Sequence, residues 1–142
     1  MTSSSIRPPF VGLRPFEMAD HHWFRGRDQE IVTLLHKVHN NRFTAVVGAS
    51  GSGKSSLVRA GILPRLTDED WQTVITKPGS APIAKLALAL SEKAREEGND
   101  PLANARTYRY DMTLRQSAYG LTEVTDKLAP DAPKLLLVVD QF

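Results

Sequence analysis

The sequence predicts an α/β fold built on a parallel β-sheet, and three observations lead to that prediction. Apolar runs typical of strands alternate along the chain with longer runs whose apolar residues recur at helical spacing. A glycine-rich loop stands between the first strand run and the helix that follows it. The last strand run is continuously apolar, as expected of a central strand covered on both faces. We count three strands, at 43–47, 71–76 and 134–140, and therefore expect an incomplete sheet.

The glycine-rich loop, residues 48–55, carries the strongest functional signal in the chain. It matches the pattern G-x-x-x-x-G-K-[ST] of a phosphate-binding loop, or P-loop. Backbone N–H groups can curl around an anion only where the chain takes turns that crowd a Cβ, which suits Gly51 and Gly53. The loop then enters a helix whose first N–H groups face the phosphates. The predicted nucleotide contacts are Gly48, Ala49, Ser50, Gly51, Ser52, Gly53, Lys54, Ser55 and Ser56.

Three residues are expected to neutralise the phosphates or to bind Mg²⁺ at this site. Lys54 would bring its ammonium to the β- and γ-phosphates, and Ser55 would offer its hydroxyl to the bridging Mg²⁺. Asp140 ends the last strand, at the sheet edge where ligands bind in open α/β sheets, so it would hold Mg²⁺ through water. The competing interpretations are a turn that merely caps a helix and an ordinary loop acid at a strand end, but a plain cap needs neither this spacing nor the lysine.

The segment before the loop should contribute a strap and a helix. Residues 1–9 are expected to be extended or disordered, and the irregular, apolar residues 10–24 should lie as a strap over a domain. Asp28 is a plausible N-cap for a helix that ends at Asn40 and Asn41. Its inner face would hold Ile31, Leu34, Leu35 and Val38.

The segment after the loop should contain further helices. The helix that begins at Lys54 is expected to run to about Leu63, because Pro64 should block its continuation. A strong helical pattern covers 83–97, and residues 102–128 predict one or two helices interrupted at Gly120.

Composition places the chain in the soluble globular class. The 142 residues suit one domain, with 41% hydrophobic and 24% charged residues. A net charge of +2 gives no support to nucleic-acid binding. The absence of cysteine excludes disulfides, and no signal peptide or membrane-spanning stretch is evident, so a cytoplasmic location and no membrane partner are the default expectations.

Four segments resemble the novel STAND NTPase domain, a branch of the AAA-like P-loop signal-transduction ATPases. They are residues 12–16, residues 23–27 with Glu30, residues 46–61 and residues 138–142. The resemblance runs from about Pro9 onward and implies the three-layer α/β/α P-loop NTPase fold. Residues 10–142 are therefore predicted to form part of such a domain, truncated at its C-terminal end.

The resemblance also implies a function and further site residues. It places Gly26 and Arg27 beside the base, favours ATP while leaving GTP possible, and implies Mg²⁺. Such proteins act as nucleotide-dependent switches next to WD-repeat or effector domains, and a nucleotide-dependent oligomer is possible. The alternative for Arg27 is a surface pair with Glu30.

Departures from the family pattern limit the expected activity. The acidic residues, the sensor arginine and the lid that follow the last strand in the family are missing here. We therefore assign no catalytic residue and expect binding without efficient hydrolysis. The strand that separates the two functional strands in AAA-like sheets is also missing. Either a gap stays open there or the last strand pairs with the first. The alternative function is a structural or protein-interaction module with a vestigial phosphate loop.

Overall fold

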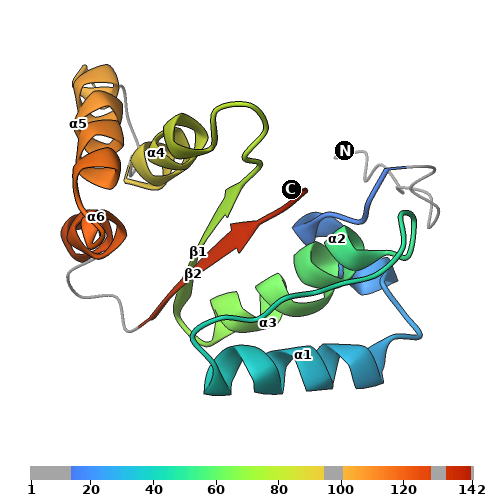
Figure 1. Cartoon of the computed structure of the whole chain (residues 1–142). Coiled ribbons are helices and arrows are strands. Elements are labelled where there is room, and N and C mark those ends of the chain that lie inside the picture. The colour runs from blue at the N-terminus through green and yellow to red at the C-terminus, as the bar shows by residue number, and fades with distance from the viewer. Residues whose placement is uncertain (1–13, 95–100, 129–133, 142) are drawn as a thin grey trace, which may run out of the picture. The chain divides into compact units, whose positions relative to one another are not determined.

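The computed structural model describes residues 14–94, 101–128 and 134–141, which form a mixed α/β structure (Figure 1). The chain divides into two compact units, residues 1–68 and residues 69–142. Predictions for residues 1–9, for Phe10 and Leu13 of the strap, and for the end of the 83–97 helix lie outside the described residues.

The described residues of the first unit are helical apart from their connections. A 3₁₀ helix, η1 (Met18–Trp23), precedes α1 (Asp28–Asn40). After the glycine-rich loop, α2 (Lys54–Ser56), the π-helical segment η2 (Leu57–Ile62) and α3 (Leu63–Asp68) follow without a break. The apolar side chains that these helices bury are Ile31, Leu34, Val38, Leu57, Ala60, Ile62, Leu63 and Leu66.

Helix α1 matches its prediction closely. It ends at Asn40, and three of its four predicted inner residues are buried while Leu35 is half-buried. Asp28 is the first helical residue, so Arg27 takes the N-cap position that we predicted for Asp28. Helix α1 packs on η2 (Figure 1), where Gly61 allows a close approach. A Cβ on Gly61 would lie 3.0 Å from Cγ1 of Ile31.

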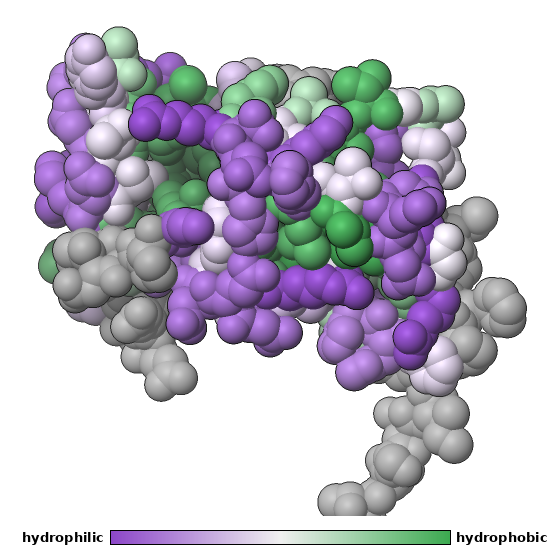
Figure 2. Space-filling model, turned by 90° about the horizontal axis from the view of Figure 1, so that it is seen from below, coloured by the Kyte–Doolittle hydropathy of each residue, from purple (hydrophilic) through white to green (hydrophobic). Residues whose placement is uncertain are grey.

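The strand predicted at 43–47 does not form. Phe43 is 84% exposed and Val47 is 90% exposed, and neither belongs to a strand. A strand needs a neighbour for its N–H and C=O groups, and no strand in the described ranges pairs with this segment. Hydrophobic residues also reach the surface elsewhere, as Figure 2 shows for one face of the molecule.

The prediction that the helix after the loop ends before Pro64 is wrong. The helix continues through Pro64 to Asp68. In a regular α-helix the proline ring would clash with the carbonyl four residues earlier, here that of Ala60. The six residues of η2 are π-helical, and the Leu63 N–H bonds to the Val58 carbonyl, five residues back. The wider turn gives room for the ring, because it displaces the carbonyls that a tighter turn would bring close.

The second unit contains a small parallel sheet. Strand β1 (Trp71–Thr76) pairs with β2 (Lys134–Val139), in a register that runs from Trp71 opposite Lys134 to Thr76 opposite Val139. Both strands form where the sequence predicted them. The alternative in which the last strand pairs with residues 43–47 is wrong.

Three helices connect the two strands, as a parallel pair requires. They are α4 (Pro82–Lys93), α5 (Ala103–Gln116) and α6 (Gly120–Leu128). They lie on one side of the sheet (Figure 1), where the buried residues are Val74, Ala87, Leu90, Tyr110 and Val124. Residues 135–138 of β2 are only half-buried, which corrects the prediction that both faces of this strand are covered.

The pattern over 102–128 resolves into two helices, α5 and α6. Gly120 is the first residue of α6 and is buried. A Cβ at Gly120 would lie 2.4 Å from the Thr113 carbonyl oxygen, so only glycine fits the crossing between these helices.

Among the described residues, no helix combines the length and the apolar character that a bilayer crossing demands.

Candidate functional site

The glycine-rich loop connects residues 43–47 to α2 and turns sharply twice. Gly51 has a φ of +76° and Gly53 a φ of +80°, a region that side chains other than glycine rarely adopt. The Ser52 N–H donates to the Ala49 carbonyl oxygen at 3.2 Å and closes the turn between them. Both glycines thus occupy positions that need glycine for the backbone conformation itself.

The Lys54 side chain folds back across this loop. Its Nζ donates to the carbonyl oxygens of Gly48 and Ala49, each at 2.8 Å. Gly48 is closely packed against the side chains of Ser52 and Lys54. A Cβ on Gly48 would lie 3.0 Å from the Ser52 hydroxyl oxygen and 3.7 Å from Cδ of Lys54. A positive charge is therefore held over the loop by two charge-assisted hydrogen bonds.

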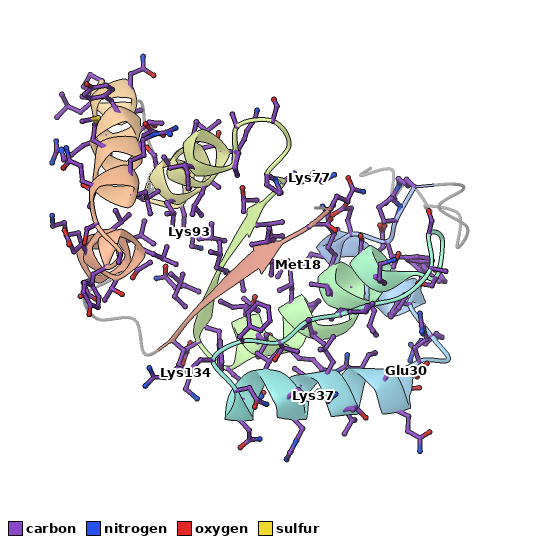
Figure 3. All side chains as sticks on the ribbon, viewed as in Figure 1. Met18, Glu30, Lys37, Lys77, Lys93 and Lys134 are labelled. Carbon is purple, nitrogen blue, oxygen red and sulfur yellow. The ribbon has the colours of Figure 1, made fainter. Side chains whose placement is uncertain are left out.

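The Arg27 guanidinium reaches the same loop from the start of α1. Its Nη1 donates to the Ser52 carbonyl oxygen at 2.9 Å, and its Nε donates to Oε1 of Glu30 at 3.2 Å. Glu30 projects from the first turn of α1 (Figure 3). A hydrogen bond from its own backbone N–H, and then the Arg27 contact, hold the pKa of Glu30 below its ordinary value. Gly26, the other residue predicted beside a base, has a φ of +81°.

The described part of the strap lies against the helix that follows the loop. The Phe16 backbone N–H donates to the Ser56 hydroxyl oxygen at 3.0 Å. Arg59 pairs with Glu17, and the Phe16 and Phe24 rings lie 5.6 Å apart. The hydroxyl oxygen of Ser56, a predicted nucleotide contact, thus accepts a hydrogen bond from the strap.

An ion pair with a buried carboxylate shapes the strap itself. Asp20 of η1 is 4% exposed, and its Oδ2 lies 2.6 Å from Nη1 of Arg14. The same carboxylate accepts the Glu17 backbone N–H at 3.0 Å. These bonds satisfy a charge that would otherwise be costly to bury.

Asp140 belongs to the second unit and directly follows β2. Its backbone N–H donates to the Thr76 carbonyl oxygen at 2.9 Å, which extends the ladder of the parallel pair by one bond. Gln141 then takes a positive φ of 62° and turns the chain. Asp140 therefore stands at the carboxyl end of its strand, as the sequence predicted. Its meeting with the loop at a common Mg²⁺ stays a prediction.

The comparison with protein families decides the classification. A family model described as Novel STAND NTPase 1 matches residues 9–142, which include the strap, the loop and both strands. The chain belongs to the novel STAND NTPase family. In general terms, this membership makes it a nucleotide-binding signalling module. Comparison with curated proteins and with solved structures found no match.

Ser55 and Asp140 of this STAND domain carry oxygen donors, the type of ligand that Mg²⁺ prefers. Within the described ranges, no group of three His, Cys, Asp or Glu residues could hold a metal. Mg²⁺ is commonly bound by one or two carboxylates together with substrate phosphates and water. The hydroxyl of Ser55, the second residue of α2, and the carboxylate of Asp140 are each donors of the right kind for such an ion.

Some contacts of the STAND domain were missed by our sequence analysis. The pairs Phe16–Ser56 and Glu17–Arg59 join residues about forty positions apart, and neither pair forms a recognisable motif. The apolar character of the strap predicted that it would cover a domain, but its partners could not be identified. The Arg27–Glu30 pair was foreseen as the alternative to a base contact, whereas the Arg27 bond to Ser52 was not.

Proposed function

We propose that this STAND domain binds ATP with Mg²⁺ and acts as a nucleotide-dependent signalling switch. Lys54 neutralises charge on the β- and γ-phosphates, and backbone N–H groups of the loop surround them. Ser55 holds Mg²⁺ directly and Asp140 holds it through water. The backbone of Gly26 and Arg27 lies on the base side of the nucleotide.

The observation that carries this proposal is the position of the Lys54 ammonium. A lysine at the end of an ordinary turn extends into water, because its ammonium is strongly hydrated. Here the ammonium is fixed on the Gly48 and Ala49 carbonyl oxygens. A phosphate that enters the loop would replace these carbonyls as the acceptor of the Lys54 ammonium. The ammonium thus lies on the loop itself, which supports the assignment of Lys54 to the phosphates.

The same proposal includes the three-layer α/β/α fold of P-loop NTPases. The exposed apolar side chains of Phe43 and Val47 support it, since residues 43–47 would become a buried strand once a neighbouring strand pairs with them. Residues 10–142 then form part of a domain that controls attached WD-repeat or effector domains, in the cytoplasm and with a possible nucleotide-dependent oligomer.

Ligand-dependent stability tests the proposal. Binding to the folded form should stabilise the protein by about 2.7 kcal/mol when Mg²⁺–ATP is a hundredfold above its Kd, and should raise the melting temperature. Lys54→Ala should abolish the rise, whereas Lys37→Ala, at an exposed lysine of α1, should retain it. EDTA should reduce the rise if Mg²⁺ bridges the phosphates. GTP in place of ATP tests the choice of base.

A second function, that of a protein-interaction module with a vestigial loop, is favoured by the exposure of Phe43 and Val47. Apolar side chains gathered on a surface are typical of sites that another chain covers. This alternative predicts no change in melting temperature with any nucleotide. A flat response of the wild-type protein would therefore support the interaction module over the switch.

A further inference from the structure

The Arg27 side chain forms a bridge between α1 and the glycine-rich loop. One arm of its guanidinium, Nη1, donates to the Ser52 carbonyl oxygen, while Nε donates to Glu30. The same Nη1 lies 3.1 Å from the position that a Cβ on Gly53 would take. The guanidinium therefore lies against the Ser52–Gly53 peptide, from an anchor on the first turn of α1.

The Arg27 bond to the Ser52 carbonyl oxygen also fixes the direction of the Gly53 N–H. The described chain has no cis peptide, and in a trans peptide the C=O and the following N–H point in opposite directions. Because Arg27 holds the Ser52 carbonyl oxygen, the Gly53 N–H must point away from the guanidinium. Gly53 follows with a φ of +80°, which glycine adopts about as readily as a negative φ, so contacts such as the Arg27 bond select this conformation.

The two cations of the loop hold three of its carbonyl groups. Lys54 takes the carbonyl oxygens of Gly48 and Ala49, and Arg27 takes that of Ser52. A carbonyl oxygen that points at a phosphate repels it, whereas an N–H group attracts it. The Arg27 bond does not have to break when a phosphate binds Lys54, so it can keep the Ser52 carbonyl oxygen on a cation and leave the N–H of the same peptide, at Gly53, to face the anion.

We propose that Arg27 is a positioning residue that fixes the Ser52–Gly53 peptide so that the Gly53 N–H faces the bound phosphate. This inference rests on the proposed function, because it assigns a role within the same phosphate site. In this proposal the Arg27 side chain contacts the phosphate loop, and only backbone groups of Gly26 and Arg27 contact the base. Glu30 orients the guanidinium through Nε while Nη1 holds the Ser52 carbonyl oxygen, so the role requires two N–H groups in the fixed geometry of an arginine.

Titration with a ligand that has no base tests this role. We expect Arg27→Ala to weaken the binding of Mg²⁺–tripolyphosphate and of Mg²⁺–ATP by the same factor, about tenfold, as loss of one hydrogen bond from a charged donor predicts. A loss confined to ATP would overturn the proposal, because it would make Arg27 a base contact. Unchanged binding of both ligands would overturn it as well.

Two further variants separate positioning from charge. Arg25→Ala removes the same charge two residues away, where the Arg25 side chain donates to the His22 carbonyl oxygen and not to the loop. It should bind both ligands as the wild type does. Arg27→Lys keeps the charge but loses the fork, and should behave like Arg27→Ala. Full recovery in Arg27→Lys would contradict the positioning role.

Amide NMR supplies a readout that general destabilisation would not move. In the wild type, tripolyphosphate should shift the Gly53 N–H resonance strongly downfield. In Arg27→Ala at saturating tripolyphosphate, that shift should be largely lost while the spectrum of α1 stays unchanged. A Gly53 shift of wild-type size in the variant would refute the proposal. If the wild type binds neither ligand, the proposed nucleotide-binding function is wrong. That result is distinguishable from a failure of the Arg27 proposal, in which the wild type binds and the variant binds equally well.

Discussion

The backbone N–H of Phe16 donates to the side-chain hydroxyl of Ser56 at 3.0 Å and ties the strap to the helix that follows the glycine-rich loop. Ser56 is 8% exposed, so a Phe16 N–H that loses this acceptor is poorly placed to find water. We expect Ser56→Ala to lower the free energy of unfolding by about 1 kcal/mol. Urea unfolding without nucleotide measures the change.

Ser50→Ala is the matched control for this substitution. Ser50 lies in the same loop but is exposed, so its replacement should leave the urea midpoint nearly unchanged. Equal midpoints for Ser56→Ala and Ser50→Ala would show that the strap does not depend on this bond.

A second prediction concerns the crossing of α5 and α6. A methyl group on Gly120 would collide with backbone atoms of Thr113 and Leu114, which cannot move aside as a flexible side chain could. Gly120→Ala should therefore destabilise the protein by about 2 kcal/mol or more, despite the higher helix propensity of alanine. Thermal unfolding measures it. Thr122→Ala, at an exposed position of α6, should be neutral or slightly stabilising, and the same result for Gly120→Ala would contradict the observed packing.

A third prediction concerns the pH dependence of an ion pair on α5. Nε of Arg115 lies 2.8 Å from Oδ2 of Asp111, one turn earlier. The hydrogen bond from Arg115 lowers the pKa of Asp111, so its contribution to stability is present above the ordinary pKa of an aspartate and is lost as the pH falls through the lowered value. Asp111→Asn should lower the melting temperature at pH 7 but not at a pH below the lowered pKa of Asp111, where the wild-type carboxyl is protonated as well.

A double-mutant cycle checks that the partner is Arg115. In an Arg115→Gln background, Asp111→Asn should have almost no further effect at pH 7. An undiminished effect in that background would assign the stability of Asp111 to another contact.

Local patterns were sufficient to predict most of the helices and both paired strands. Helix α1 and strand β1 follow from apolar spacing and from the residues that flank them, and these signals lie within each segment. The P-loop pattern likewise located the loop and the start of its helix at Lys54. Gly120 was recognised as an interruption, although its reason, the close approach of Thr113, is a tertiary contact.

The incorrect predictions depend on neighbours that a single segment does not reveal. Residues 43–47 have strand composition, but a strand forms only where another strand accepts its hydrogen bonds. Pro64 ends a regular helix, but the π-helical turns before it make room for the ring. The contact of Arg27 with Ser52 joins a helix start to a loop twenty-five residues away, beyond the reach of any local pattern.

The central claim is that the loop around Lys54 binds the phosphates of a nucleotide. Calorimetric titration of the protein with Mg²⁺–ATP tests it most directly. We predict saturable binding with one site per chain, and a loss of at least about a hundredfold in affinity for Lys54→Ala, because the charge over the Gly48 and Ala49 carbonyls would be removed. Absence of heat from the wild-type protein, or equal affinity of the wild type and Lys54→Ala, would contradict the claim.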